Sequence, residues 1–151
     1  MAIKLDMSKV YDKVEWCFLE KIMSKMGFDN KWIKLIMSCI NSVSYSVLIN
    51  GEAYGCITPM RGLRQGDPLS PYMFLLCTKG LTAMIVEAER RRQISSISIC
   101  RGNLTITHLL FANDSVIYCK ATEQESRELC AILHKYVEAA GHKHRKVIGL
   151  F

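Results

Sequence analysis

The chain lacks the features that mark several large classes of protein. No apolar run reaches the roughly 18 residues that a membrane-spanning helix needs, and the first residues, Met1 to Asp6, form no signal-peptide pattern. Internal repeats, low-complexity tracts and Pro/Gly-rich linkers are missing, and the sequence holds only 3 prolines. These absences argue against a membrane-spanning, repeat or disordered protein and favour one folded domain.

Paired cysteine motifs are absent as well. The 7 cysteines are odd in number and lie far apart, mostly in apolar surroundings, with no Cys-x-x-Cys arrangement. We interpret them as reduced core residues of an intracellular protein rather than as a zinc site or a disulfide framework. They are Cys17, Cys39, Cys56, Cys77, Cys100, Cys119 and Cys130.

The bulk composition is that of a globular domain. Half of the 151 residues are apolar and 23% are charged, and a chain of this length buries roughly 70% of its unfolded surface. The formal net charge is +6 and the pI is about 9.0. A basic balance is compatible with a polyanionic partner, and equally with a basic protein that has none.

Hydrophobic periodicity divides the chain into helices and strands. The order predicts an α+β domain with helices gathered on one face of a small antiparallel sheet. The expected elements are a strand at 3–6, helices at 14–27 and 30–40, a hairpin at 43–49 and 53–58, a helix from 70 to about 92, a strand at 97–99, strands at 104–111 and 115–119, and a helix from 122 to 141.

Local signals predict the caps and turns of these elements. Asn30 and Thr122 are expected to cap the second and the last helix. Ser70 followed by Pro71 predicts the start of the long helix, with the hydroxyl as N-cap and proline in the first helical position. Asn50–Gly51 favours a type I′ hairpin turn.

Three polar features stand out from this pattern. Asp6 ends the first strand and brackets residues 7–11 together with Asp12. A polar loop runs from Arg64 to Pro71 and leads into a helix, and Asp114 lies in a turn between two apolar strands. Carboxylates brought together at strand ends repel each other, and a hard cation such as Mg²⁺ relieves that repulsion. Taken singly, Asp6 can be a helix cap, and Asn113–Asp114 can be ordinary turn chemistry.

The sequence around these features resembles the reverse-transcriptase domain of plant LINE-like (non-LTR) retrotransposons over nearly the whole chain. Residues 4–16 resemble the first palm motif, and residues 62–71, from Gly62 to Pro71, resemble the second. Residues 109–115 resemble the third motif, a turn that normally carries two adjacent aspartates. Residues 141–143 resemble the start of a fourth. The implied fold is a polymerase palm, in which we expect the strand ending at Asp6 to lie beside the hairpin whose turn holds Asn113 and Asp114, with Tyr11 and Gln65 bordering the same cleft.

The resemblance implies a role for each matching residue. Asp6 and Asp114 are metal ligands for two Mg²⁺ ions, and Tyr11 lies under the incoming sugar, where it excludes a 2′-hydroxyl. Gln65 and Gly66 shape the floor beneath the nascent base pair. Two further residues complete the expected site: Ala112, which approaches the primer end, and Arg64, which contacts phosphate or is simply a solvated charge.

Asn113 departs from the family pattern, because it stands where the first aspartate of the turn is expected. We also expect residues 1–151 to be a partial domain without fingers and thumb. The function implied is that of an RNA-directed DNA polymerase acting on an RNA template, a DNA primer and dNTPs, in a copy that is inactive on its own. The alternative is a non-catalytic remnant with weak, salt-sensitive nucleic-acid binding.

Overall fold

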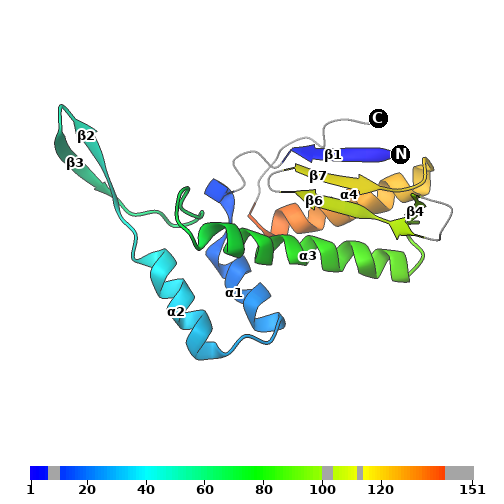
Figure 1. The fold of residues 1–151 in the computed structure, drawn as a ribbon, viewed down its shortest axis with the longest axis horizontal. Coiled ribbons are helices and arrows are strands. Elements are labelled where there is room, and N and C mark those ends of the chain that lie inside the picture. Colours follow the sequence, from blue (N-terminus) through cyan, green and yellow to red (C-terminus); the bar gives the residue numbers. More distant parts are fainter. Residues whose placement is uncertain (7–10, 100–103, 112–113, 142–151) are drawn as a thin grey trace.

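A three-stranded antiparallel sheet organises the fold. The computed structural model of the chain describes residues 1–6, 11–99, 104–111 and 114–141. The sheet consists of β1 (Ala2–Asp6), β6 (His108–Phe111) and β7 (Asp114–Tyr118), in the order β1-β7-β6. The first strand of the chain therefore lies beside a hairpin more than a hundred residues away (Figure 1).

Two long helices, α3 (Ser70–Arg90) and α4 (Glu123–Ala139), cover one face of this sheet (Figure 1). Strand residues alternate between the faces, so Ile3 and Ile117 are buried beneath the helices while Leu109 is exposed. The predicted α+β class, with helices on one face of a small antiparallel sheet, is confirmed. Within the described residues no helix, not even the 21-residue α3, is long and apolar enough to cross a membrane.

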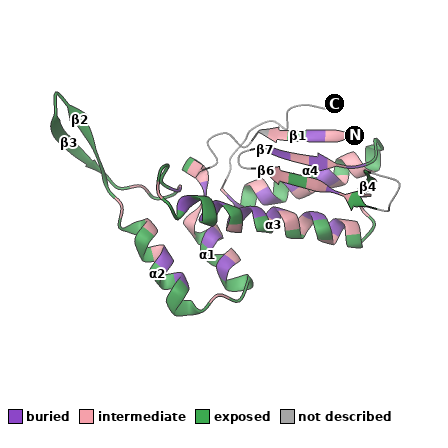
Figure 2. Ribbon diagram, in the orientation of Figure 1, coloured by how far each residue is buried: buried purple, intermediate pink, exposed green. Residues whose placement is uncertain are grey.

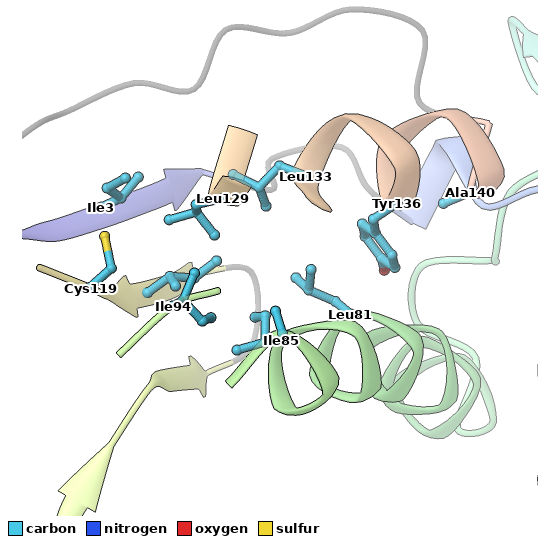
Figure 3. Packing of buried hydrophobic residues seen from close by; sticks show 11 residues of the cluster. Ile3, Leu81, Ile85, Ile94, Cys119, Leu129, Leu133, Tyr136 and Ala140 are labelled. Carbon is cyan, nitrogen blue, oxygen red and sulfur yellow. The ribbon is translucent and has the colours of Figure 1, made fainter. Parts of the chain in front are cut away.

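The main core fills the space between the sheet and these helices (Figure 3). Its side chains come mainly from β1, β7, α3, α4 and the segment after α3, so it joins the first strand to the helix α4. The buried members are Ile3, Leu81, Ile85, Ala88, Ile94, Ile117, Cys119, Leu129, Leu133, Tyr136 and Ala140.

A second core is built from the helices α1 (Trp16–Lys25) and α2 (Asn30–Asn41) and the first half of α3. A short 3₁₀ turn, Tyr11–Lys13, leads into α1. Apolar residues at helical spacing place one face of each helix in this core. The buried members are Val14, Leu19, Met23, Ile33, Ile36, Leu63, Met73, Phe74 and Cys77.

The hairpin of β2 (Tyr45–Ile49) and β3 (Glu52–Ile57) projects away from both cores (Figures 1 and 2). The φ angles at Asn50 and Gly51 are 51° and 86°, the signs that the predicted type I′ turn requires. All residues of the two strands are exposed. The exposed large apolar side chains of this hairpin are Tyr45, Val47, Leu48, Ile49, Tyr54 and Ile57.

The strand expected at 104–111 is two strands. Residues Thr105–Ile106 form β5, which pairs with β4 (Ile97–Ser98), whereas β6 pairs with β7. The two halves pair with different strands, so the ladder is interrupted at Thr107, which is buried. The prediction of one continuous strand was wrong for this reason.

Two of the predicted caps are displaced by one residue. The N-cap of α2 is Asp29, whose Oδ1 accepts a hydrogen bond from the Lys31 amide at 2.8 Å, and Asn30 is the first helical residue. The N-cap of α3 is Leu69, so Ser70 lies inside the helix. Thr122 caps α4 as predicted, with its hydroxyl accepting from the Glu125 amide.

The cysteines are less buried than their apolar surroundings suggest. Cys77 and Cys119 are buried core residues, as predicted. Four others are exposed free thiols, and for these the expectation of a core position was wrong: Cys17, Cys39, Cys56 and Cys130. Cys100 lies outside the described residues. Apolar neighbours in sequence do not determine which face of a helix or hairpin a residue occupies.

Candidate functional site

The strand ends that carry the candidate metal ligands lie side by side. The register of β1 and β7 pairs Asp6 with Asp114, and the register of β6 and β7 pairs Phe111 with the same Asp114. Directly opposed residues of an antiparallel pair are about 4.5–5.5 Å apart at Cα. The predicted adjacency of these strands is confirmed, whereas the catalytic roles of the two aspartates stay predictions.

Two other candidates, Ala112 and Asn113, lie outside the described residues, as do residues 7–10 between Asp6 and Tyr11. In the ranges that the structure does describe, no cluster of three or more His, Cys, Asp or Glu side chains is arranged to hold a metal.

Backbone hydrogen bonds join the segment after β1 to the loop before α3. The Leu63 amide donates to the Tyr11 carbonyl at 2.6 Å, and the Gly62 amide donates to the Val14 carbonyl at 2.8 Å. The Trp16 indole Nε1–H donates in turn to the Gly62 carbonyl at 2.8 Å. Segments almost fifty residues apart are thus tied together at three points.

Tyr11 is held by an aromatic contact as well. Its ring stacks on Phe74, with centroids 4.9 Å apart and planes 23° from parallel. Phe74 is 2% exposed and belongs to the second core, so the ring on which Tyr11 rests is itself fixed. The structure therefore places Tyr11 next to Leu63, where the loop that carries Gln65 and Gly66 begins.

That loop is fixed at its far end by Asp67. The Asp67 carboxylate accepts from the Leu69 amide at 2.7 Å, and its carbonyl accepts from the Ser70 amide at 3.2 Å. Between the two fixed ends, residues 64–66 are exposed. Gly66 has a φ of +84°, and no atom lies within 4 Å of the position that a Cβ atom would take. The backbone of the loop is therefore accessible at Gly66.

Residues of the same loop also line a cavity of about 270 Å³. Its polar lining includes Asp12, Arg61, Arg64 and Asp67, and apolar side chains of α2, α3 and the base of the hairpin complete the wall. Of the predicted site residues, Arg64 lines this cavity, whereas Tyr11 and Gln65 do not.

Sequence reasoning missed two residues of this arrangement. Trp16 and Asp67 lie within the matched segments 4–16 and 62–71, but neither was given a role of its own. A buried indole usually donates its N–H to an acceptor, and aspartate often bonds backbone amides two residues ahead. These tendencies indicate that both residues have partners, but they do not identify Gly62 as the partner of Trp16.

A family model described as reverse transcriptase (RNA-dependent DNA polymerase) matches residues 1–146. An uncharacterized mitochondrial protein of Arabidopsis thaliana is 47% identical over 68 residues, which are 45% of this chain and 56% of that protein.

Two longer polyproteins match more of the chain. The retrovirus-related Pol polyprotein of the type-1 retrotransposable element R2 of Popillia japonica is 27% identical over 77% of the chain. The corresponding polyprotein of the type-2 element R2DM of Drosophila melanogaster is 25% identical over 77% of the chain. The chain spans 18% and 10% of these two proteins, and about half of the Arabidopsis protein.

Proposed function

The chain belongs to the reverse transcriptase family, and on that premise we propose that it is the palm of an RNA-directed DNA polymerase. The observation that carries this proposal is the register of Asp6 with Asp114 at one end of the sheet. A two-metal site needs carboxylates that share ions about 4 Å apart, and neighbouring strand ends supply that spacing.

Each part of the proposed site serves the transfer of a nucleotide to a primer 3′-hydroxyl. Asp6 and Asp114 would hold two Mg²⁺ ions, which would lower the pKa of the attacking hydroxyl and stabilise charge on the leaving pyrophosphate. The protein itself mainly positions the reactants. RNA template, DNA primer and dNTP are the partners that this reaction requires.

Three residues of the loop side would contact the substrates. Tyr11 would lie under the sugar of the incoming nucleotide, and Gln65 and Gly66 would form the floor beneath the nascent base pair. The hydrogen bond between Leu63 and Tyr11 supports this assignment, because it brings the two segments together. Arg64 would contact phosphate, and Ala112 would approach the primer end.

Asn113 would weaken metal binding and therefore nucleotide transfer by this chain. An amide oxygen can coordinate Mg²⁺ but carries no formal charge, so two divalent ions would face two carboxylates instead of three. We therefore infer weakened metal binding and no processive synthesis by this chain. The alternative function, a remnant that binds nucleic acid weakly and salt-sensitively, is favoured by this same substitution.

Metal binding tests the proposal even if the chain does not polymerise. Mn²⁺ titration in the presence of a dNTP, followed by electron paramagnetic resonance, should show a weak site in the full chain. Asn113→Asp should tighten it, and Asp6→Ala should weaken it at least roughly tenfold, the loss typical when even an outer-shell partner is removed. Indifference of Mn²⁺ binding to Asp6→Ala would overturn the assignment.

Primer extension on an RNA template separates the two functions. We expect no extension by the chain as it stands, with Mg²⁺ or Mn²⁺. If Asn113→Asp gives metal-dependent incorporation that Asp6→Ala abolishes, the polymerase function is supported. Robust extension by the unaltered chain would contradict the inferred defect at Asn113.

A further inference from the structure

The start of the loop at residues 62–67 is held by a side chain that none of the motif roles uses. The Trp16 indole donates to the Gly62 carbonyl at 2.8 Å across 46 residues of sequence. Gly62 is outside any helix or strand, so its carbonyl depends on a partner of this kind. A partly buried carbonyl without a donor is unfavourable, and Trp16 removes that cost.

Trp16 is also anchored on a helix, so it can restrain the loop that follows Gly62. It is the first residue of α1, and α1 packs into the second core through Leu19 and Met23, which are fully buried. The donor is thus anchored on a rigid helix. Its acceptor, Gly62, directly precedes Leu63, whose amide bonds Tyr11.

We propose that Trp16 is a positioning residue, which sets residues 64–66 against Tyr11 through its hydrogen bond to Gly62. The proposal rests on the proposed function, because it gives the exposed residues Arg64, Gln65 and Gly66 a nucleic-acid substrate to meet. With Asp67 fixing the far end of the loop, the indole fixes the near end. Loss of the indole N–H leaves the near end held by two backbone bonds, the buried Leu63 side chain and the exposed ion pair between Arg61 and Glu15.

Trp16→Phe tests this, because it keeps an aromatic ring and removes the donor. The matched control is Trp32→Phe, since Trp32 is the only other tryptophan and is 49% exposed on α2. Limited trypsin digestion reports on the loop itself, because Arg64 is followed by Gln65 in its exposed part. Arg127, exposed on α4, serves as a reference cleavage site.

We expect Trp16→Phe to speed cleavage after Arg64 by roughly three- to tenfold, the factor that one hydrogen bond contributes. Cleavage after Arg127 should stay unchanged, and Trp32→Phe should alter neither site. An unchanged rate after Arg64, or an equal increase at Arg64 and Arg127, would overturn the proposal, because the second result means general loosening of the fold.

Binding of an RNA–DNA hybrid, measured by fluorescence anisotropy, connects the loop to its substrate. We expect Trp16→Phe to weaken binding severalfold at low salt and Trp32→Phe to leave it unchanged. A hybrid affinity equal to that of the unaltered chain, with the loop loosened, would overturn the link to substrate. If the unaltered chain binds no hybrid, the proposed function fails, and the digestion still decides whether Trp16 positions the loop.

Discussion

Gly62 lies so close to Asp12 that a Cβ atom at Gly62 would stand 2.9 Å from the Asp12 carbonyl oxygen. Gly62 also has a φ of +88°, in the left-handed region that favours glycine. Four residues further on, Gly66 has a φ of +84° but nothing within 4 Å of its virtual Cβ. A side chain at Gly66 would therefore meet backbone strain alone, whereas a side chain at Gly62 would meet both backbone strain and a steric clash.

Gly62→Ala should destabilise the fold more than Gly66→Ala. Left-handed backbone strain, about 1–2 kcal/mol, applies to both variants. Only Gly62→Ala adds a clash with backbone, and overpacking of this kind costs about 1–3 kcal/mol more. Urea unfolding followed by circular dichroism measures the difference, and equal losses of stability would refute the close approach of Gly62 to Asp12.

Glu125 should make stability depend on acidic pH. Partial burial raises its pKa, but hydrogen bonds from the Lys120 amide and from the Ser95 hydroxyl and amide outweigh this and leave the pKa lowered. A lowered folded-state pKa means that the carboxylate stabilises the fold above the ordinary value of about 4.5 and that this contribution is lost as pH falls below it.

Glu125→Gln should therefore destabilise the chain by about 1 kcal/mol at pH 7, after allowance for solvent screening. The deficit should shrink as the pH is lowered from 7 to 3. Glu123→Gln is the control, because Glu123 is 79% exposed and is paired with Arg127 on the surface. Thermal melts across this pH range measure both variants, and a deficit of constant size would argue against the carboxylate contacts.

Alkylation should divide the cysteines into two groups. Burial raises the pKa of Cys77 to about 12 and raises that of Cys119 as well, and the thiolate is the reactive form. We expect iodoacetamide at pH 8 to modify the exposed Cys17 and Cys130 rapidly and the two buried thiols only after unfolding. Mass spectrometry of timed digests identifies each site, and rapid native-state modification of Cys77 would contradict the packing of α3.

Tyr136→Phe should weaken the contact between α4 and α3. The buried Tyr136 hydroxyl donates to the Cys77 carbonyl at 3.3 Å, a bond whose loss we expect to cost about 0.5–1.5 kcal/mol. Burial, with a smaller contribution from Cys77, raises the tyrosine pKa, so the neutral ring stabilises the fold up to about pH 10 and this contribution is lost at higher pH.

Tyr72→Phe provides the matched control on the surface, because Tyr72 is 65% exposed on α3. Its free energy of unfolding should match that of the unaltered chain within about 0.5 kcal/mol. Equal effects of the two substitutions in urea unfolding would show that the hydroxyl of Tyr136 does not tie α4 to α3.

The sequence predicted the strand that ends at Asp6, because a short apolar run is a local signal. It placed Asp114 in the turn before a strand at 115–119, whereas β7 begins at Asp114 and ends at Tyr118. The pairing of these strands was implied by the resemblance to palm motifs rather than by periodicity. The break in the strand at Thr107, in contrast, could not be predicted from the sequence. The apolar run around it reads as one strand, and the interruption arises because its halves pair with different strands, which no local pattern encodes.

The tie between Trp16 and Gly62 could not be predicted for a similar reason. Helical periodicity assigns Trp16 to an apolar face, and the partner of its N–H is determined by packing of segments 46 residues apart. The one-residue displacement at Asp29 is of a different kind. Asp29 and Asn30 are both good N-caps, so local chemistry narrows the helix start to two neighbouring residues without deciding between them.

The pairing of β1 with β7 has a consequence for how the chain folds during synthesis. Contacts of large sequence separation form late, because the loop between them must close first. The described buried residues of the second core lie between Val14 and Cys77, so this core can form early, whereas β1 must wait for β7 to be made. A chain interrupted before Asp114 would keep a helical cluster but have no paired aspartates, so premature termination removes the proposed metal site before it removes most of the helical structure.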